Sequence, residues 1–481
     1  MNSNKKIEKI YNYVVVAYVM AVVLYQVYFK VTPVQVFLTQ TGLDIISQGL
    51  AMGGLLLFIG DLFITRYSTK GYLSKFLVGI IGALILSSLL YMSYGWTNNA
   101  KIIIWQINQM LVIYPVYQRL SQVQWKKVLH GLYFGVILVI LPSAVISIMQ
   151  FIMSLSYTTL SDGFDIKQGF QEGRLFGIFT SIYFSSIMIT VLLIATIYYF
   201  SKTKRKSMKI FYGFSAVVFY FYFVLTATRS VQVGVMAAIV IVGSALLSNR
   251  LDRKFKKKAA LCAVSFIIAV VAAGGFYVVN NATDYLLKKI PVAYMNSDLS
   301  DKFNNDTLIH HNLELNRTDV KMADISNHRV VIWSNYLQIT GSRVKSILFG
   351  MSPGNAMSFI KDNYPDKFIV TYIKKAYPEM YAKNLTYDTH NSYLSIFTAT
   401  GLLGVILLGS FGVAYFRKLL RTLWNNKNLD SSTLTLMIIM VVILASAFFD
   451  SDLFFKCTST SVTLWLVAGM LAKKLTGSEG R

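Results

Sequence analysis

The sequence predicts an all-α protein that crosses a membrane about twelve times. Of its 481 residues, 55% are hydrophobic and only 14% are charged, whereas a soluble domain of this length needs more polar residues to cover its surface. Apolar runs of about 18 residues or more, the length that spans the hydrocarbon core, recur along the chain. Barrel strands would instead be shorter segments of alternating polarity. We therefore expect one integral membrane domain over residues 1–481.

Twelve segments have the length and apolarity of a membrane-spanning helix. In chain order they are Tyr11–Phe29, Ile46–Ile64, Phe76–Tyr94, Ile102–Tyr117, Val128–Met153, Ile178–Phe200, Ile210–Ala227, Val231–Leu247, Ala259–Val279, Tyr393–Phe416, Ser432–Phe449 and Phe454–Leu471. Two segments are the weakest: the fourth, which is short and interrupted by polar residues, and the last, which is rich in Ser and Thr. Twelve spans place both termini on the same side of the membrane.

The distribution of charge supports this topology. The formal net charge is +24, and most of the 46 Lys and Arg residues gather at the two termini and in alternate short connections. Such a bias orients helices in a bacterial inner membrane, so both termini are predicted to be cytoplasmic. The positive charge is therefore no argument for a nucleic-acid partner. The basic connections are Arg66–Lys75, Arg119–Lys127, Lys202–Lys209, Arg250–Lys258 and Arg417–Lys427.

Two connections on the opposite, outer side are longer. Residues 154–177 are predicted to form a polar loop, and residues 281–389 form a large extracytoplasmic loop between the ninth and tenth spans. The large loop mixes charges of both signs and is rich in Trp and Tyr, which favours a folded, water-exposed unit. Within it, Arg329–Leu348 has helical character, and Gly350 and Gly354 predict a turn.

Three arginines border the predicted spans or the loop helix. Arg229 stands between two apolar runs whose connection is so short that the helices must form a tight hairpin, and charge this near the bilayer is often functional. Arg174 precedes the sixth span in a similar way. For both, an arginine that reaches lipid headgroups is the alternative, and it needs no chemistry. Arg329 opens the loop helix, where a local anion could compensate its positive charge, although a plain surface arginine is the commoner explanation.

His390 is the best candidate for a general base. It is the outer histidine nearest a predicted span, and an ordinary histidine pKa near 6.5 suits proton transfer at neutral pH. The alternative is a polar residue at the start of a helix, with Asp388, Thr389 or Asn391 as the cap.

The sequence gives little support for a metal site or for an ATP-binding site. Asp450-Ser451-Asp452 has the form of a metal-binding pair, but hard cations usually need more oxygen ligands than two acids supply. The chain has no phosphate-binding Gly-rich loop that ends in Lys-Ser or Lys-Thr, so an ATPase is not predicted.

Most of the candidate residues belong to short motifs. His390-Asn391, followed after nine residues by Gly401-Leu402-Leu403-Gly404, resembles a pattern of the O-antigen ligase and Wzy-type polymerase superfamily. The order and the membrane side of the other motifs also agree with that family, and Thr228 in place of the commoner serine is a minor departure. These motifs are Arg174-Leu175-Phe176-Gly177, Thr228-Arg229-Ser230, Arg329-x-x-x-Trp333 and Gly350-x-x-x-Gly354-Asn355.

The resemblance implies a GT-C-like membrane glycosyltransferase that uses neither nucleotide sugar nor metal nor another cofactor. Its donor would be an oligosaccharide on undecaprenyl pyrophosphate at the outer face of the cytoplasmic membrane, and its acceptor a glycan hydroxyl. On this resemblance Arg229, Arg329 and His390 are expected to be catalytic. Arg174, Trp333, Asn355 and Asn391 are expected to bind substrate.

Three functions stay open at this point. A polymerase of lipid-linked repeat units for capsule or exopolysaccharide is favoured, because the Lys-, Ile-, Asn- and Tyr-rich composition suggests an AT-rich genome and an organism without lipid A. An O-antigen ligase that transfers finished glycan to lipid A core or another terminal acceptor is the alternative. A transporter or flippase is less favoured, because few charged residues lie inside the spans. Beyond donor, acceptor and membrane lipid, a chain-length regulator would be a further partner.

Overall fold

The computed structural model describes residues 3–153, 155–161, 164–250, 329–425 and 430–476, with isolated residues between 265 and 282. This described part is mostly helical, which confirms the predicted all-α membrane fold. Eight of its helices are long and apolar enough to cross a membrane. They are α1 (Ser3–Tyr28), α2 (Thr32–Ile64), α6 (Gln122–Ile152), α7 (Ile182–Lys202), α8 (Lys206–Leu225), α9 (Arg229–Arg250), α16 (Ser392–Asn425) and α17 (Ser431–Ser446).

The remaining predicted spans are shorter or differently built. The third is α4 (Ser74–Leu90), which ends before the short helix η1 (Met92–Tyr94), and the fourth divides into α5 (Thr97–Ile107), the π-helical η2 (Asn108–Ile113) and η3 (Tyr114–Gln118). The twelfth was predicted to begin at Phe454, but α18 (Ser459–Thr476) begins five residues later. The predicted span Ala259–Val279 lies mostly outside the described residues, so the count of twelve stays a prediction.

The predicted polar loop 154–177 is instead a three-stranded antiparallel sheet. β1 (Ser156–Ser161) pairs with β2 (Phe164–Gln171), and β2 pairs with β3 (Arg174–Gly177). Glu172 and Gly173 join β2 to β3 with positive φ angles of 53° and 68°, as a two-residue hairpin turn requires. The sixth span consequently begins at Ile182, not at Ile178 as predicted.

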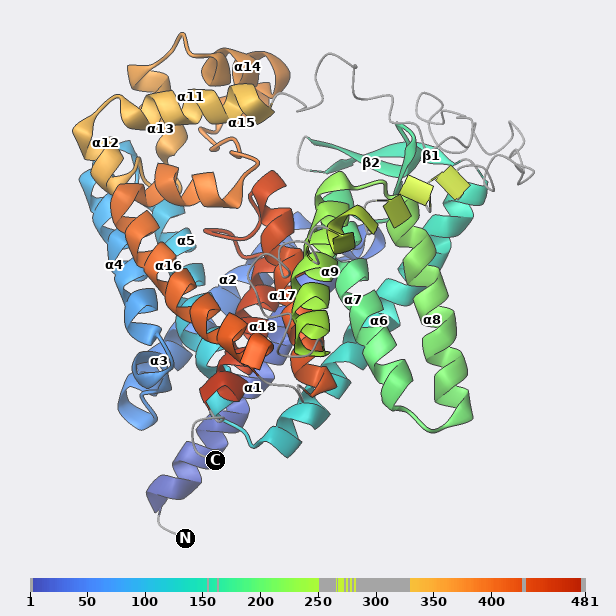
Figure 1. The fold of residues 1–481 in the computed structure, drawn as a ribbon. Helices are drawn as coiled ribbons and strands as arrows, with labels where there is room; N and C mark the ends of the chain where they lie inside the picture. Colours follow the sequence, from blue (N-terminus) through green and yellow to red (C-terminus); the bar gives the residue numbers. More distant parts are fainter. Residues whose placement is uncertain are drawn as a thin grey trace.

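The large loop contributes a compact helical unit, the cap, which we define as residues 329–391. It contains α11 (Arg329–Gly341), α12 (Val344–Phe349), α13 (Ala356–Asn363), α14 (Phe368–Ala376) and α15 (Pro378–Ala382). The cap and the sheet lie at one end of the helical bundle, which we name the cap end (Figure 1). α1 begins and α18 ends toward the opposite end, which we name the terminal end (Figure 1).

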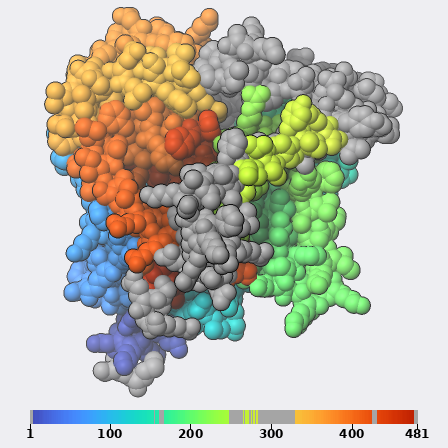
Figure 2. All heavy atoms as spheres, viewed as in Figure 1, coloured from blue at the N-terminus to red at the C-terminus, as the bar shows by residue number. Residues whose placement is uncertain are grey.

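The cap has its own apolar core. Tyr336, Phe359 and Ile369 are almost fully buried in it, apart from the main core of the bundle. Figure 2 shows the cap as one continuous body over the neighbouring ends of α4 and α16. Tyr91 at the end of α4 joins this core and its hydroxyl lies 2.8 Å from the hydroxyl of Ser346 in α12.

A tight seam joins the cap to α16. α16 was predicted to be one continuous span from Tyr393, but Gly401 breaks it with non-helical angles of φ 63° and ψ −159°. The backbone of Gly350 packs directly against this break, since a Cβ on Gly350 would lie 2.3 Å from the carbonyl carbon of Ala399. The amide of Met351 donates to the carbonyl oxygen of Thr398 at 2.7 Å. Two motif glycines therefore permit a backbone-to-backbone contact that side chains would prevent.

A buried ion pair joins segments of the chain at the terminal end. Arg119, between η3 and α6, places its guanidinium 2.6 Å from the carboxylate of Asp61 in α2, and both side chains are 1% exposed. Asp61 also accepts hydrogen bonds from the backbone and the hydroxyl of Ser68 in α3 (Tyr67–Lys70). This pair therefore ties the end of α2 to the connection before α6, 58 positions later in the sequence.

Candidate active site

The cap holds the segment that precedes His390 against α11. The indole N–H of Trp333 donates to the carbonyl oxygen of Thr389 at 2.9 Å, and the hydroxyl of Tyr336 donates to the carbonyl oxygen of Tyr387. Because Trp333 lies one turn after Arg329 on α11, these bonds bring Arg329 and His390 within electrostatic range of each other. Two residues predicted to be catalytic, 61 positions apart, therefore lie near each other.

His390 has an unusual backbone and an open side chain. Its φ of 49° lies in the left-handed region, which costs a non-glycine residue on the order of 1 kcal/mol and needs support from the surroundings. The ring of Tyr387 meets the imidazole edge-on at 5.5 Å. Among the described residues, no hydrogen bond uses either imidazole nitrogen, so both are available to a ligand.

Burial lowers the pKa of the His390 imidazole, and the charge of Arg329 lowers it further, while Asp388 opposes the shift. The neutral form is therefore favoured at neutral pH. A neutral imidazole can accept a proton, which is the property a general base needs.

Asn391 caps the helix that follows. Its side-chain oxygen accepts hydrogen bonds from the amides of Tyr393 at 2.9 Å and Leu394 at 3.0 Å, and this is the geometry of an N-cap. Thr389 donates its hydroxyl to the carbonyl oxygen of Asn391 at 2.7 Å. Asn391 thus orients the backbone beside His390, and its expected contact with substrate stays a prediction.

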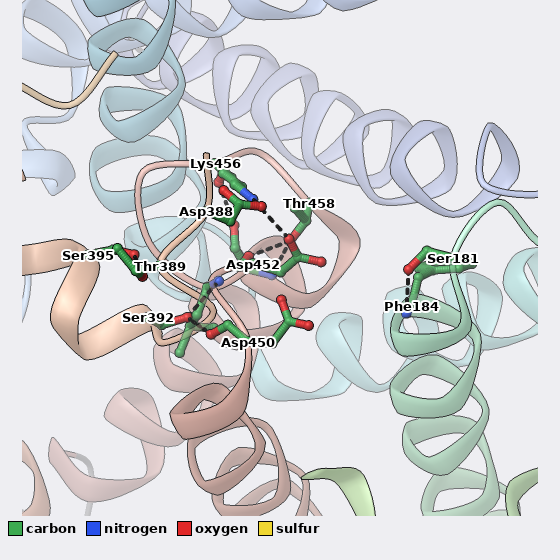
Figure 3. A network of polar contacts seen from close by, with 12 residues as sticks. Ser181, Phe184, Asp388, Thr389, Ser392, Ser395, Asp450, Asp452, Lys456 and Thr458 are labelled. Carbon is green, nitrogen blue, oxygen red and sulfur yellow. Dashed lines mark hydrogen bonds and ion pairs between the residues drawn. The ribbon is translucent and has the colours of Figure 1, made fainter. Parts of the chain in front are cut away.

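A charged network connects this segment to the turn between α17 and α18. Lys456 places its ammonium group 2.5 Å from Asp388 and 3.4 Å from Asp452 (Figure 3). Ser392 donates its hydroxyl to the carbonyl oxygen of Asp450 at 2.7 Å, and Thr458 donates to that of Asp452 at 2.7 Å. Burial works against the charge of Lys456, but Asp388 and Asp452 outweigh it and raise the pKa of this ammonium.

The two acids of the turn differ in their surroundings. Burial and the neighbouring charge of Asp452 raise the pKa of the Asp450 carboxyl well above its usual range. Asp452 is instead paired with Lys456. Since Lys456 already bridges Asp388 and Asp452, it takes the position that a cation between these acids would occupy. Across the described ranges, no group of three or more His, Cys, Asp or Glu side chains is arranged to hold a metal ion.

Lys30 is a second cation that sequence reasoning missed. It lies between α1 and α2, and its carbonyl oxygen accepts the amide of Thr180, which ties this connection to the start of α7. Burial lowers the pKa of the Lys30 ammonium, while the charge of Asp452 opposes this. Lys30 looked like an ordinary flanking charge in the sequence, and Lys456 fell inside a predicted span. The only available signal was the spacing of four residues between Asp452 and Lys456.

Arg229 approaches the same end of the bundle from another side. It is the first residue of α9, after the tight hairpin with α8 that the sequence predicted, and its side chain is exposed. Within the described part of the chain it forms no ion pair. α9 runs antiparallel to α17, because Gly234 lies against Val442 and Ser446 near the end of α17. Arg229 is therefore at the cap end, where the Asp450 turn follows α17.

Arg174 and Asn355 are less open. Arg174 lies on β3, not at the entry of a helix as predicted, and its guanidinium is 3.2 Å from the carboxylate of Glu172. The amide of Asn355 donates to the carbonyl oxygen of Gly95 at 2.6 Å, and Asn355 is 5% exposed. Asn99 accepts from the amide of Gly354 at 2.8 Å. The turn that contains Asn355 thus anchors the cap to α5, and contact of either residue with substrate stays a prediction.

The fold and this site define a class: a polytopic membrane protein with histidine, acids and several cations gathered at one end of its bundle. Residues 214–409 match the family model described as O-antigen ligase, which confirms the predicted resemblance. The match includes Arg229, Arg329 and His390 and covers about two fifths of the chain. Arg174 lies outside it. No curated protein matches the chain.

Proposed function

We propose that this protein is an inverting glycosyltransferase that polymerises oligosaccharide units linked to undecaprenyl pyrophosphate. The observation that carries the proposal is the imidazole of His390, free of hydrogen bonds to any described residue and within electrostatic range of Arg329 and Lys456. His390 and Arg329 lie within the stretch that matches the O-antigen ligase family. Members of this family are glycosyltransferase-like enzymes that act on lipid-linked glycans. In this proposal the cap end faces outward from a bacterial cytoplasmic membrane.

The proposed reaction is a single displacement at the anomeric carbon of the donor sugar. The acceptor hydroxyl oxygen forms the new bond to that carbon, and the bond from the carbon to the pyrophosphate oxygen breaks. The hydroxyl proton passes to a nitrogen of neutral His390, and the electron pair of the broken bond leaves with the lipid pyrophosphate. The favoured neutral state of His390 suits it for this proton.

The reaction also requires positive charge near the leaving pyrophosphate. Negative charge gathers on the pyrophosphate as the bond breaks, and fixed cations stabilise such charge most when they are in place beforehand. Arg229 and Arg329 are each suited to bind two oxygens of a phosphate at once, because a guanidinium presents its donors as a planar fork. Lys30 and Lys456 add positive charge, although Lys456 is shared with Asp388. Arg174 is proposed to bind donor or acceptor at the edge of this site.

Transfer of finished glycan to a terminal acceptor is the second candidate function. The description of the matching family as O-antigen ligase favours it, and the same residues would perform the same displacement on a different acceptor. The two functions differ in the product. A polymerase lengthens glycan that stays on the lipid pyrophosphate, whereas a ligase moves glycan of unchanged length off the lipid.

Reconstituted coupling is the decisive experiment. The purified full chain in phospholipid vesicles receives a synthetic pyrophosphate-linked oligosaccharide, and products are separated by length. We expect a ladder of lipid-linked products from the unmodified chain, and at least about a hundredfold slower coupling from His390→Ala, as loss of a general base predicts. No elongation without a terminal acceptor, together with glycan transfer when one is supplied, would favour the ligase.

Arg343→Ala is the matched control for Arg329→Ala. Arg343 is also an arginine of the cap, but its guanidinium is bonded to Asn363 at 2.8 Å on the cap surface. Only Arg329→Ala is expected to slow coupling strongly. The assay is repeated with EDTA, which we expect to leave the rate unchanged; strong inhibition would revive a metal at Asp450 and Asp452.

A further inference from the structure

We propose that a cavity at the terminal end of the bundle binds an anionic phospholipid. The cavity has a volume of about 1070 Å³, and its walls come from α1, α6, α7, α8, α16, α17 and α18. A volume of this size suits a small-molecule ligand rather than a few waters. None of the residues proposed for glycan transfer lines it. The inference therefore goes beyond the proposed function and does not depend on it.

The mouth of the cavity is basic. Lys126 and Lys127 come from the first turns of α6, Lys202 ends α7, and Lys473 and Lys474 lie near the end of α18. Asp430, before α17, is the single acid among the lining residues. Five cations against one acid make this mouth attractive to a ligand with a negative headgroup.

The five lysines divide into two kinds. Lys473 donates to the carbonyl oxygens of Tyr117 and Leu120, and Lys474 lies 2.7 Å from Asp430, so both are engaged. Lys126, Lys127 and Lys202 are exposed and form no ion pair with any described residue. These three are the groups available to a phosphate.

The interior is apolar. Val136, Met188, Leu192, Ile439 and Leu466 line it, from four different helices. Met188 and Lys202 are 14 residues apart on α7, so at about 1.5 Å per residue the lined wall extends about 21 Å from the mouth into the bundle. An acyl chain fits a long apolar wall of this kind, and a soluble anion would leave it empty.

Aromatic side chains lie between these two zones. Tyr198 and Tyr199 line the cavity about one turn inward of Lys202, and Tyr212 stacks on Tyr199. Trp125 lines the mouth itself, beside Lys126. Trp and Tyr favour the boundary between hydrocarbon and headgroup, because one end of each ring is apolar and the other forms hydrogen bonds. The cavity thus has a basic mouth, then an aromatic boundary and then an apolar interior. This order matches a phospholipid, which has a charged headgroup at one end and apolar tails at the other. A polyprenyl tail that entered from the cap end would have no use for the lysines.

Lipid binding by the purified full chain in neutral detergent tests the proposal, with bound lipid counted by native mass spectrometry. The probes are palmitoyl-oleoyl phosphatidylglycerol, its phosphatidylcholine counterpart and soluble glycerol phosphate. We expect phosphatidylglycerol to bind most tightly. Replacing Lys126, Lys127 and Lys202 together by Gln is expected to weaken it at least about tenfold, given how strongly single cations attract anionic lipid.

Two further variants keep this test specific. Lys204, Lys206 and Lys209 lie on the same end, in and after the connection from α7 to α8, and do not line the cavity. Their joint replacement by Gln removes the same charge and should change binding less than about twofold, because it leaves the local charge at the mouth intact. Ala195→Trp fills the cavity without changing charge and should also weaken binding.

Three results would overturn the proposal. Equal losses from the two lysine triples would mean general attraction to a basic surface. Glycerol phosphate that binds as tightly as the phospholipid, with no effect of Ala195→Trp, would mean a site for soluble anions. Equal affinity for phosphatidylcholine would mean an apolar groove without headgroup recognition. Because the measurement is lipid binding, failure of the glycan-coupling assay would leave this result unaffected.

Discussion

At the scale of single residues, the polar side chains at the cap end are of two kinds. Some form hydrogen bonds to backbone groups of the protein, and others remain available to a ligand. Trp333, Asn355 and Asn391 give their polar atoms to neighbouring backbone groups. His390 and Arg229 give theirs to no described residue. Open polar groups in a charged setting are where chemistry is expected, so these two are the first targets for substitution.

The pH dependence of coupling should report the protonation of His390. Because its pKa is lowered in the folded protein, we expect kcat/KM to stay level through neutral pH and to fall only below the ordinary histidine value of about 6.5. Asp388 opposes the lowering, so Asp388→Asn should move this acid limb to lower pH. Rates of purified variants measured from pH 5 to pH 8 check this, and a shift to higher pH would contradict it.

Lys456→Met should have the opposite effect. The ammonium of Lys456 lowers the pKa of His390, so its removal leaves Asp388 and Asp452 uncompensated and raises that pKa. The acid limb of the same pH profile should then move to higher pH. If Lys456→Met and Asp388→Asn moved the limb in the same direction, the group that titrates would not be His390.

At the scale of elements, the seam between the cap and α16 depends on glycine. Gly401→Ala should destabilise the protein by about 1–3 kcal/mol, because φ is positive there and a Cβ would lie 2.4 Å from the carbonyl carbon of Leu348. Gly412→Ala is the matched control on the same helix, where a Cβ has nothing within 4 Å. It should be neutral or slightly stabilising. Thermal unfolding in detergent, followed by fluorescence, compares the two; equal losses would contradict the seam.

Elements were predictable where one physical signal dominated. Long apolar runs located the helices, because a bilayer admits few alternatives for them. The sheet at residues 156–177 was missed because short polar strands lack that signal, although Asp162-Gly163 is a pair that favours hairpin turns. The break at Gly401 could not be read from the sequence, since one glycine inside a helical run is ordinarily tolerated. Lys456 lies in the turn before α18, because this helix begins at Ser459 and not at Phe454 as predicted.

At the scale of the whole molecule, the terminal end depends on the buried pair of Arg119 and Asp61. Arg119→Leu leaves a carboxylate buried without its partner and should cost about 3–5 kcal/mol. Replacing both residues by Leu should recover much of that loss, since no charge then remains buried. Unfolding of the reconstituted protein in a denaturing detergent measures both variants. Equal stability of the single and double variants would show that the charge pair is not what holds these segments.

The proposed orientation makes a prediction for the whole chain. With both native cysteines replaced by serine, Asp366→Cys in the cap should react with an impermeant maleimide added to intact cells. Lys204→Cys at the terminal end should react only after the cells are opened. The reverse pattern would place the cap inside and would remove the outward-facing site.

Because the cap has a separate core, its stability depends on the surrounding water, whereas the stability of the spanning helices depends on the surrounding lipid. The cap's buried aromatic and aliphatic residues are held together by water, in the way of a soluble domain. The spanning helices meet a medium as apolar as their own side chains and are held by packing and hydrogen bonds. A detergent that replaces the lipid acts on the second set of forces, whereas urea dissolved in the outer water acts on the first. A single melting temperature for this protein would therefore combine two stabilities, coupled through the seam at Gly350 and Gly401, the contacts of the cap with α4 and α5, and the ion pair of Asp388 with Lys456.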